Sequence, residues 1–320
     1  MVDISIVVPV YNEEESLPEL AEWIGRVMAA NRYSYELIFV NDGSTDSSWE
    51  VIRELSRTNG HIKAIGFTRN YGKSAALDIG FAKSNGQVVI TMDADLQDSP
   101  DEIPALYNMI TQQGYDIVSG WKKKRHDPIT KTIPSRFFNG FTRFISGIKL
   151  HDFNCGLKAY RRKVVKNIHI YGEMHRYIPL IAKWSGFGKI GEKVVEHRPR
   201  KYGYTKFGLE RFVNGFLDLI SVSFVNRYKK NPMHFFGLLG SLSFLTGFGI
   251  TLWLIFEKLH ALKEGLKVRE ITDQPLFFLA IAAVIIGVQL FLTGFLAEMM
   301  TSNNSRKTDY NIDEEINFLE

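Results

Sequence analysis

Two carboxylates stand one residue apart, at Asp93 and Asp95, directly after a short apolar run. Val88-Val89-Ile90 predicts a buried strand, because β-branched residues in a short run bounded by turn formers suit the centre of a sheet. Neighbouring carboxylates repel unless a cation lies between them, and Mg²⁺ and Mn²⁺ accept such oxygen ligands together with phosphate oxygens. An ordinary surface turn is the alternative, since Asp is common in turns.

Three further strands are predicted upstream, and each ends in polar residues. They cover Ile4–Val10, Glu36–Val40 and Ile62–Phe67. Apolar residues recur at helical spacing from Leu17 to Met28, which predicts a helix after the first strand. Strands alternating with helices predict a parallel, doubly wound α/β sheet. Because parallel strands end at one edge, the polar clusters should gather there as a site for a charged ligand.

These polar clusters carry a resemblance to a known family. The segments are Val-Pro-Val-Tyr-Asn-Glu (8–13), Val-Asn-Asp-Gly-Ser-Thr-Asp (40–46), Arg-Asn-Tyr-Gly-Lys (69–73) and Asp-Ala-Asp-Leu-Gln (93–97). Together they resemble the ordered signature of family 2 glycosyltransferases with the GT-A fold, a Rossmann-like, mostly parallel sheet. Within that family the chain resembles the polyprenyl-phosphate glycosyltransferases. That group contains dolichyl-phosphate mannosyltransferase and bacterial undecaprenyl-phosphate glucosyltransferases, and the match covers roughly residues 1–230.

On the donor side, the resemblance implies a role for each matching residue. Asp95, with help from Asp93 and Gln97, would hold Mg²⁺ or Mn²⁺ and neutralise the leaving diphosphate. Asp42 would contact the base or ribose, and Tyr11 would either stack on the base or only pack. The residues expected to bind the nucleotide sugar are Pro9, Tyr11, Glu13, Asp42, Arg69, Lys73 and Asp93.

On the acceptor side, two more segments match the family. His-Asp-Phe-Asn-Cys-Gly-Leu-Lys (151–158) resembles the acceptor motif, with Asp152 at its acidic position. Arg-Pro-Arg-Lys-Tyr-Gly-Tyr-Thr-Lys (198–206) resembles the basic loop in which Arg200 and Lys206 approach a phosphate, although Thr205 stands where Ser is more usual. The expected catalytic set is therefore Asp95, Asp152, Arg200 and Lys206. An acceptor phosphate is already anionic and needs no base, and Asp152 is expected to act either as an orienting residue or as a base.

A basic run covers residues 122–126. It is either a solvated loop or a segment that attracts anionic lipid and an acceptor phosphate. In the second case Arg125 and Arg136 would bind the acceptor phosphate. The formal charge of +4 is too small to indicate nucleic acid. The eight histidines show no zinc spacing and are interpreted as structural or incidental. A single cysteine, Cys155, excludes an intrachain disulfide and suits a reducing compartment.

Two segments without any charge, Phe235–Phe256 and Leu276–Ala297, are long enough to span a bilayer as helices. Buried helices of a soluble domain are the alternative. The predicted domains are a catalytic domain (1–206), amphipathic interfacial helices (207–232), a two-helix anchor (233–300) and a polar tail (301–320). We expect a multi-pass protein of the cell inner membrane, without a signal peptide, whose catalytic domain faces the cytoplasmic pool of nucleotide sugars.

The expected activity is inverting transfer of a hexose from UDP-glucose to a polyprenyl phosphate such as undecaprenyl phosphate. GDP-mannose is the alternative donor, and a polysaccharide synthase acting on a hydroxyl is an alternative enzyme. That enzyme is disfavoured because the chain lacks a Gln-x-x-Arg-Trp motif and has too few spans. The first strand carries no Gly-x-Gly-x-x-Gly, which disfavours a dinucleotide-dependent oxidoreductase. A catalytically silent membrane scaffold and a homo-oligomer stay open.

Overall fold

The computed structural model describes residues 2–123, 139–199, 201–202, 219, 224, 228, 231–265 and 269–304, with the side chains of 301–304 excepted. It contains two compact units, Met1–Val222 and Ser223–Tyr310. Each unit has its own helices and its own packing, so each is described by itself.

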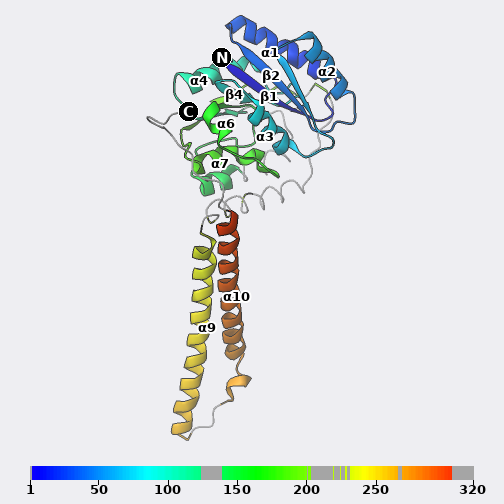
Figure 1. The fold of residues 1–320 in the computed structure, drawn as a ribbon. Coiled ribbons are helices and arrows are strands. Elements are labelled where there is room, and N and C mark those ends of the chain that lie inside the picture. The colour runs from blue at the N-terminus through cyan, green and yellow to red at the C-terminus, as the bar shows by residue number, and fades with distance from the viewer. Residues whose placement is uncertain are drawn as a thin grey trace, which may run out of the picture. The chain divides into compact units, whose positions relative to one another are not determined.

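The first unit is built on a seven-stranded sheet with the order β3-β2-β1-β4-β6-β5-β7 (Figure 1). β1 pairs in parallel with β2 and β4, and β2 pairs in parallel with β3. β6 runs antiparallel to both β4 and β5, whereas β5 and β7 are parallel. The strands are β1 (Ile4–Val10), β2 (Tyr35–Asn41), β3 (Ile62–Gly66), β4 (Val88–Thr91), β5 (Ile117–Trp121), β6 (Lys158–Arg161) and β7 (Ile190–Val194).

Helices cover both faces of this sheet. One face packs against α1 (Leu17–Asn31), α2 (Ser48–Thr58) and α4 (Ile103–Thr111), and the other against α3 (Lys73–Lys83), α6 (Arg162–Lys166) and α7 (Ile178–Trp184). Two 3₁₀ helices, η1 (Pro100–Glu102) and η2 (Met174–Tyr177), precede α4 and α7. Within β1, Ile6 and Val8 face the first core and Val7 faces the second, because side chains alternate along a strand. The predicted α/β fold with a mostly parallel sheet is confirmed.

The antiparallel strand β6 determines which residues lie next to each other at the end of β4. Its first residue, Lys158, lies opposite Thr91, the last residue of β4. The residues that follow β4 therefore lie beside the residues that precede β6. Thr91 also donates a side-chain hydrogen bond of 2.8 Å to the carbonyl oxygen of Gly156. This ladder joins the Asp93 segment to the 152–158 segment.

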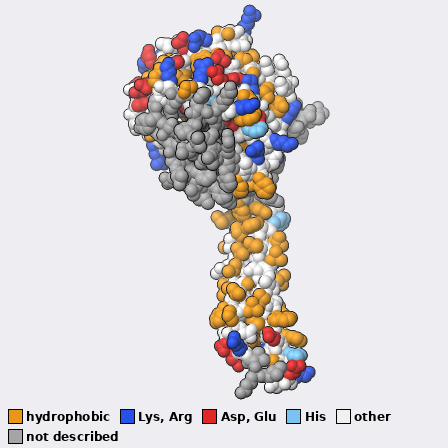
Figure 2. Space-filling view, turned by 180° about the vertical axis from the view of Figure 1, so that it is seen from behind, with side chains coloured by type: hydrophobic (Ala, Val, Ile, Leu, Met, Phe, Trp, Pro, Cys, Tyr) orange, Lys and Arg blue, Asp and Glu red, His pale blue; other side chains and the backbone are white. Residues whose placement is uncertain are grey.

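The second unit is a pair of long helices, α9 (Pro232–Lys263) and α10 (Pro275–Asn304), with the 3₁₀ turn η3 (Ile271–Asp273) before α10. Both helices are long and apolar enough to cross a membrane. Apolar side chains cover the pair along most of its length, and charged groups gather at the end that carries the connection (Figure 2). The predicted spans fall within α9 and α10. The predicted interfacial segment 207–232 and the tail 301–320 lie almost entirely outside the described residues.

Small residues allow the two helices to approach closely. A Cβ atom on Gly240 would lie 2.7 Å from the carbonyl oxygen of Gly287, and one on Gly247 would lie 2.5 Å from that of Ala280. Ser243 donates a hydrogen bond of 2.8 Å to the carbonyl oxygen of Ala283. Because lipid tails are as apolar as leucine, close backbone packing and hydrogen bonds of this kind hold membrane helices together.

Candidate active site

The loops after β1 and β2 are joined by side-chain hydrogen bonds at the carboxyl edge of the sheet. Asn12 adopts a positive φ of 56°, and its Oδ1 accepts a hydrogen bond of 2.8 Å from the backbone N–H of Thr45. The N–H of Asn12 donates to Ser44 Oγ at 3.0 Å, and that of Glu13 donates to Ser48 Oγ at 2.9 Å. Asn tolerates this backbone conformation better than most residues. The first two predicted clusters therefore form one rim.

Asp42 positions the third predicted polar segment, residues 69–73. Its carboxylate is buried and accepts hydrogen bonds from the backbone N–H groups of Tyr71 at 2.7 Å and Gly72 at 3.0 Å. Burial raises the pKa of Asp42, and these two hydrogen bonds act in the opposite direction. The next residue, Gly43, has φ of 67°, and a Cβ there would lie 2.6 Å from Asn70 N. Asp42 thus holds the loop before α3, and its expected contact with base or ribose stays a prediction.

Other predicted donor-binding residues lie exposed or half-exposed on this rim. The guanidinium of Arg69 lies 4.8 Å from the ring centroid of Tyr71, a cation–π contact at the surface. Tyr11 is 38% exposed, so its ring is open to a ligand. Pro9 lies at the edge of a pocket that also contains Lys73 and Asp93.

The Asp-x-Asp segment alternates between the core and the rim. Met92, Ala94 and Leu96 are buried, while Asp93, Asp95 and Gln97 are partly exposed. Leu96 adopts a positive φ of 61°, which is unusual for a bulky residue other than glycine. The turn is stabilised by Asp95 Oδ1, which accepts the backbone N–H of Gln97 at 3.2 Å. Strained backbone of this kind concentrates at functional sites.

Asp93 is surrounded by cations. It forms an ion pair with Lys73, the first residue of α3. Burial alone would raise the pKa of Asp93, but Lys73, Lys122 and Lys158 together lower it to about 2. A methyl group on Gly156 would lie 2.6 Å from Asp93 Cγ, so only glycine leaves room for this carboxylate. Asp93 is therefore ionised and closely confined.

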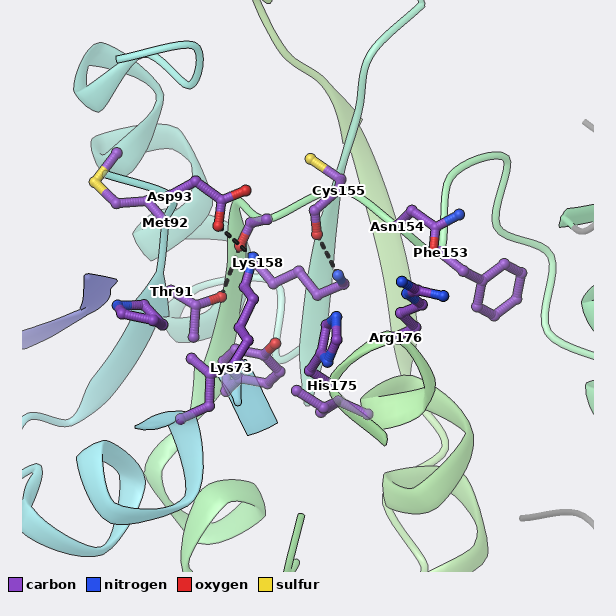
Figure 3. A pocket seen from close by; sticks show the side chains of 15 residues that line it. Lys73, Thr91, Met92, Asp93, Phe153, Asn154, Cys155, Lys158, His175 and Arg176 are labelled. Atoms are coloured by element: carbon purple, nitrogen blue, oxygen red, sulfur yellow. Dashed lines mark hydrogen bonds and ion pairs between the residues drawn. The ribbon is translucent and has the colours of Figure 1, made fainter. Parts of the chain in front are cut away.

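Behind Asp93 lies a pocket of about 330 Å³, including its open mouth, here called the basic pocket (Figure 3). Its cationic side chains are Lys73, Lys158 and Arg176. The other lining residues are Pro9, Leu77, Thr91, Met92, Asp93, Phe153, Asn154, Cys155, Gly156, Tyr160, His175 and Ile178. The walls come from β4, α3, the 153–156 turn, β6 and η2. Segments far apart in the sequence therefore form one chamber beside Asp93.

Two groups in the basic pocket have lowered pKa values. Burial lowers the pKa of Lys158, whose ammonium donates to the carbonyl oxygen of Cys155. Burial, followed by repulsion from Lys73, Arg176 and Lys158, places the pKa of His175 well below its usual value. His175 is therefore neutral, and its Nδ1 lies 3.1 Å from Ser74 Oγ. This histidine lines the basic pocket, and the interpretation of the eight histidines as structural or incidental stays a prediction.

Lys122 corrects one interpretation of the basic run at 122–126. Its ammonium lies 2.8 Å from Asp98 Oδ1, and the side chain of Asp98 is fully buried. Burial alone would lower the pKa of Lys122, but Asp98 and Asp93 raise it above its usual range. Lys122 is thus part of a buried ion pair under the Asp-x-Asp turn and is no solvated loop residue. Arg125 and Arg136 lie outside the described residues.

The predicted acceptor motif is anchored by Asp152. This residue is buried, and its Oδ1 accepts the backbone N–H of Asn154 at 3.1 Å. Its carbonyl oxygen accepts a hydrogen bond from Ser119 Oγ at 3.3 Å. These contacts set the turn that carries Asn154 into the basic pocket. Whether Asp152 orients the site or acts as a base stays a prediction.

The basic loop joins the Asp-x-Asp turn through Gln97. The carbonyl oxygen of Gln97 accepts the N–H of Arg198 at 2.9 Å, and its Nε2 donates to the carbonyl oxygen of Arg198 at 3.3 Å. The guanidinium of Arg198 lies 4.4 Å from the ring centroid of Trp23 on α1. Arg200 and Lys206 themselves lie outside the described residues, so their approach to a phosphate stays a prediction.

The residues around the rim fit a divalent cation. Asp93 and Asp95 offer carboxylate oxygens and Gln97 an amide oxygen, the donor set that Mg²⁺ and Mn²⁺ prefer. Gly156 leaves Asp93 the space that a Cβ would fill. In the described part of the chain, no three His, Cys, Asp or Glu side chains converge. Such a sparse site suits a cation that also takes ligands from substrate phosphates.

Sequence reasoning did not single out Lys158, His175 and Arg176 as site residues. Lys158 stands at the end of the quoted acceptor motif, so that motif could have indicated it. His175 and Arg176 belong to η2, whose sequence has no spacing that links it to Asp93. Only the packing of η2 against α3 brings them together.

Comparison with known proteins agrees with this geometry. The model of the family described as glycosyl transferase family 2 matches residues 5–169. A dodecaprenyl-phosphate galacturonate synthase from Rhizobium johnstonii is 35% identical over 99% of this chain and 91% of its own length. An undecaprenyl-phosphate 4-deoxy-4-formamido-L-arabinose transferase from Yersinia pestis is 34% identical over 90% of this chain and 86% of its own length.

A solved structure shares the fold of the first unit. Glucosyl-3-phosphoglycerate synthase from Mycobacterium tuberculosis, in complex with Mn²⁺ and UDP-glucose, matches with a TM-score of 0.53. It is 21% identical and covers 70% of this chain and 79% of that chain. The sheet and its rim define a GT-A glycosyltransferase. The chain belongs to glycosyl transferase family 2.

Proposed function

We propose that this glycosyltransferase moves a sugar from a nucleotide sugar to a polyprenyl phosphate at a membrane surface. The observation that carries the proposal is the basic pocket beside the ionised Asp93, since three cations suit substrates rich in phosphate. The two apolar helices supply a reason for a lipid acceptor, and the relatives named above act with polyprenyl phosphates.

The chemistry needs no strong base. An oxygen of the acceptor phosphate forms a bond to the anomeric carbon while the bond from that carbon to the donor diphosphate breaks, and the diphosphate leaves with its electron pair. The nucleophile is already anionic near neutral pH, so positioning replaces proton removal. Attack from the side opposite the diphosphate inverts the anomeric configuration. The neutral His175 and the buried Asp152 fit such a mechanism, since neither has to accept a proton.

A divalent cation belongs to this proposal. Asp95, with Asp93 and Gln97, would hold Mg²⁺ or Mn²⁺, which would neutralise the charge that grows on the leaving diphosphate. The chain would position these cation ligands through the turn at Leu96 and through the space that Gly156 leaves beside Asp93. Lys73 adds a fixed positive charge at Asp93.

The donor sugar is the finer part of the proposal. UDP-glucose is the donor expected from the sequence, and GDP-mannose is its alternative. The two relatives are named instead for galacturonate and for 4-deoxy-4-formamido-L-arabinose. We therefore extend the proposed donors to UDP-linked sugars with a modified C4, C5 or C6 position. We place the catalytic unit on the cytoplasmic face of the inner membrane, where nucleotide sugars are available.

One experiment tests the activity and its acceptor. Membranes containing the full chain are incubated with each nucleotide sugar and either polyprenyl phosphate or the free polyprenol, and the lipid product is weighed by mass spectrometry. We expect a polyprenyl monophosphate sugar from one donor and no product from the alcohol. Equal transfer to the alcohol would contradict the phosphate-acceptor mechanism. A growing polymer of glycosidic bonds would instead indicate a polysaccharide synthase.

A further inference from the structure

We propose that the end of the basic pocket formed by Lys158, Arg176 and Asn154 binds a second oxyanion, separate from the donor diphosphate. The inference rests on the proposed function and deepens it. Two sources share the required chemistry, the phosphate of the lipid acceptor and a carboxylate on the donor sugar. Asn154 and Lys158 belong to the predicted acceptor motif, whereas Arg176 lies on η2, outside every predicted motif.

The first argument is charge. Among the described residues that line the pocket, Asp93 is the carboxylate and Lys73, Lys158 and Arg176 are the cations. Lys73 already forms the ion pair with Asp93. Among the residues that the structure describes, Arg176 forms its ion pair with the half-exposed Glu173, at 4.0 Å. The lining therefore carries more positive than negative charge away from Asp93.

The second argument is burial. The side chain of Arg176 is 17% exposed, and Lys158 is 4% exposed. Burial lowers the pKa of Lys158 even though Asp152 and Asp93 act in the opposite direction. Confined cations are costly unless a bound anion or a polar network compensates them. An oxyanion at this end would accept charge-assisted hydrogen bonds from both groups.

The third argument is position. In Figure 3, Asp93 lies on one side of the basic pocket, and Asn154 and Arg176 lie on the opposite side, with Lys158 and His175 between them. The diphosphate and its cation are expected at Asp93. A phosphate held at Arg176 would stand across the pocket from the leaving group, as inversion requires. A carboxylate on the far end of the sugar ring would occupy the same place.

Binding to the full chain in detergent tests the site directly. Farnesyl phosphate serves as a soluble acceptor probe and UDP as the nucleotide probe, each titrated with Arg176→Gln, Arg176→Lys and the wild type. A hydrogen bond to a charged group contributes about 1.5 to 3 kcal/mol, so Arg176→Gln should weaken farnesyl phosphate binding at least about tenfold. The Kd for UDP should change by less than about twofold. Arg53→Gln, an exposed arginine on α2, is the matched control.

A second variant keeps the test decisive if Arg176→Gln does not fold. Asn154 is exposed, so Asn154→Asp should fold, and it places a carboxylate at the same end of the pocket. We expect it to weaken farnesyl phosphate binding at least about tenfold by repulsion, whereas Asn154→Ala should weaken it less than about threefold. Equal loss in both Asn154 variants would contradict a charge effect.

The donor arm distinguishes the two sources. The ratio of kcat/KM for UDP-galacturonate over UDP-galactose is measured for the wild type and Arg176→Gln. If this ratio falls at least about tenfold while farnesyl phosphate binding is unchanged, the oxyanion is the donor carboxylate. If folded variants change neither the ratio nor farnesyl phosphate binding, the second-oxyanion site is wrong. Failure of the wild type to glycosylate any polyprenyl phosphate would instead refute the proposed function.

Discussion

Gly156→Ala tests how closely the site confines Asp93. A methyl group at this position would lie 2.6 Å from Asp93 Cγ, whereas ordinary contacts begin at 3.4 Å. The carboxylate would have to move by about 1 Å, since Gly156 is itself fixed by the hydrogen bond that its carbonyl accepts from Thr91. A misplacement of this size in a catalytic constellation costs about a hundredfold in rate. We therefore expect kcat to fall about a hundredfold.

The assay measures release of the nucleoside diphosphate under saturating donor and acceptor, together with the thermal unfolding temperature. Gly60→Ala is the matched control, because a Cβ there would meet no atom within 4 Å. The control should keep its activity, and both variants should stay folded. If Gly156→Ala retains more than about half of the wild-type kcat, the carboxylate of Asp93 has no fixed position in catalysis and our reasoning is refuted.

Four further predictions concern the cation, the ion pair and the two units. Asp95→Asn should lose at least about a hundredfold in turnover, and a chelator should abolish activity that Mg²⁺ or Mn²⁺ restores; full turnover in excess chelator would disprove the role of the cation. Lys122→Met should lower the free energy of unfolding by about 3 to 5 kcal/mol, because it leaves Asp98 buried without its partner. Urea unfolding measures this loss, and the double variant Lys122→Met with Asp98→Leu should recover part of it. Gly240→Leu should separate α9 from α10, which cross-linking between cysteines placed on the two helices would detect as a lost product. A chain ending near Asn231 should still bind UDP or GDP by titration but glycosylate lipid poorly; failure to bind any nucleotide would contradict the predicted domain division.

The sequence was sufficient for the first four strands because they are locally encoded, whereas β5, the antiparallel β6 and β7 were not predicted. β1 has the predicted bounds, Ile4–Val10, and the Asp-x-Asp pair follows a buried strand as expected. Patterns of apolar residues decide such features within a few residues of the chain. The apolar lengths of α9 and α10 were predicted for the same reason.

The roles of single polar side chains could not be predicted in this way. The hydrogen bonds that the carboxylate of Asp42 accepts from the N–H groups of Tyr71 and Gly72 were not foreseen, and its contact with a base or ribose stays a prediction. Lys122 belongs to a run of cations that is typical of solvated loops, yet it pairs with the buried Asp98. Arg176 has no local signal at all. Each outcome depends on a partner distant in the chain, which a pattern of neighbouring residues does not contain.

The antiparallel pairing of β6 with β4 has a consequence for protein engineering. Because Thr91 lies opposite Lys158, the ladder rather than the length of the intervening chain sets how the acceptor segment meets Asp93. A shift of one residue would move Lys158 to the other face of the sheet. Chimeras between relatives that use different sugars should therefore leave Lys122 and the residues from Asp152 to β6 with the host, and exchange only residues between these two places. Insertions of varied length in that exchanged region would then leave the donor half of the site intact.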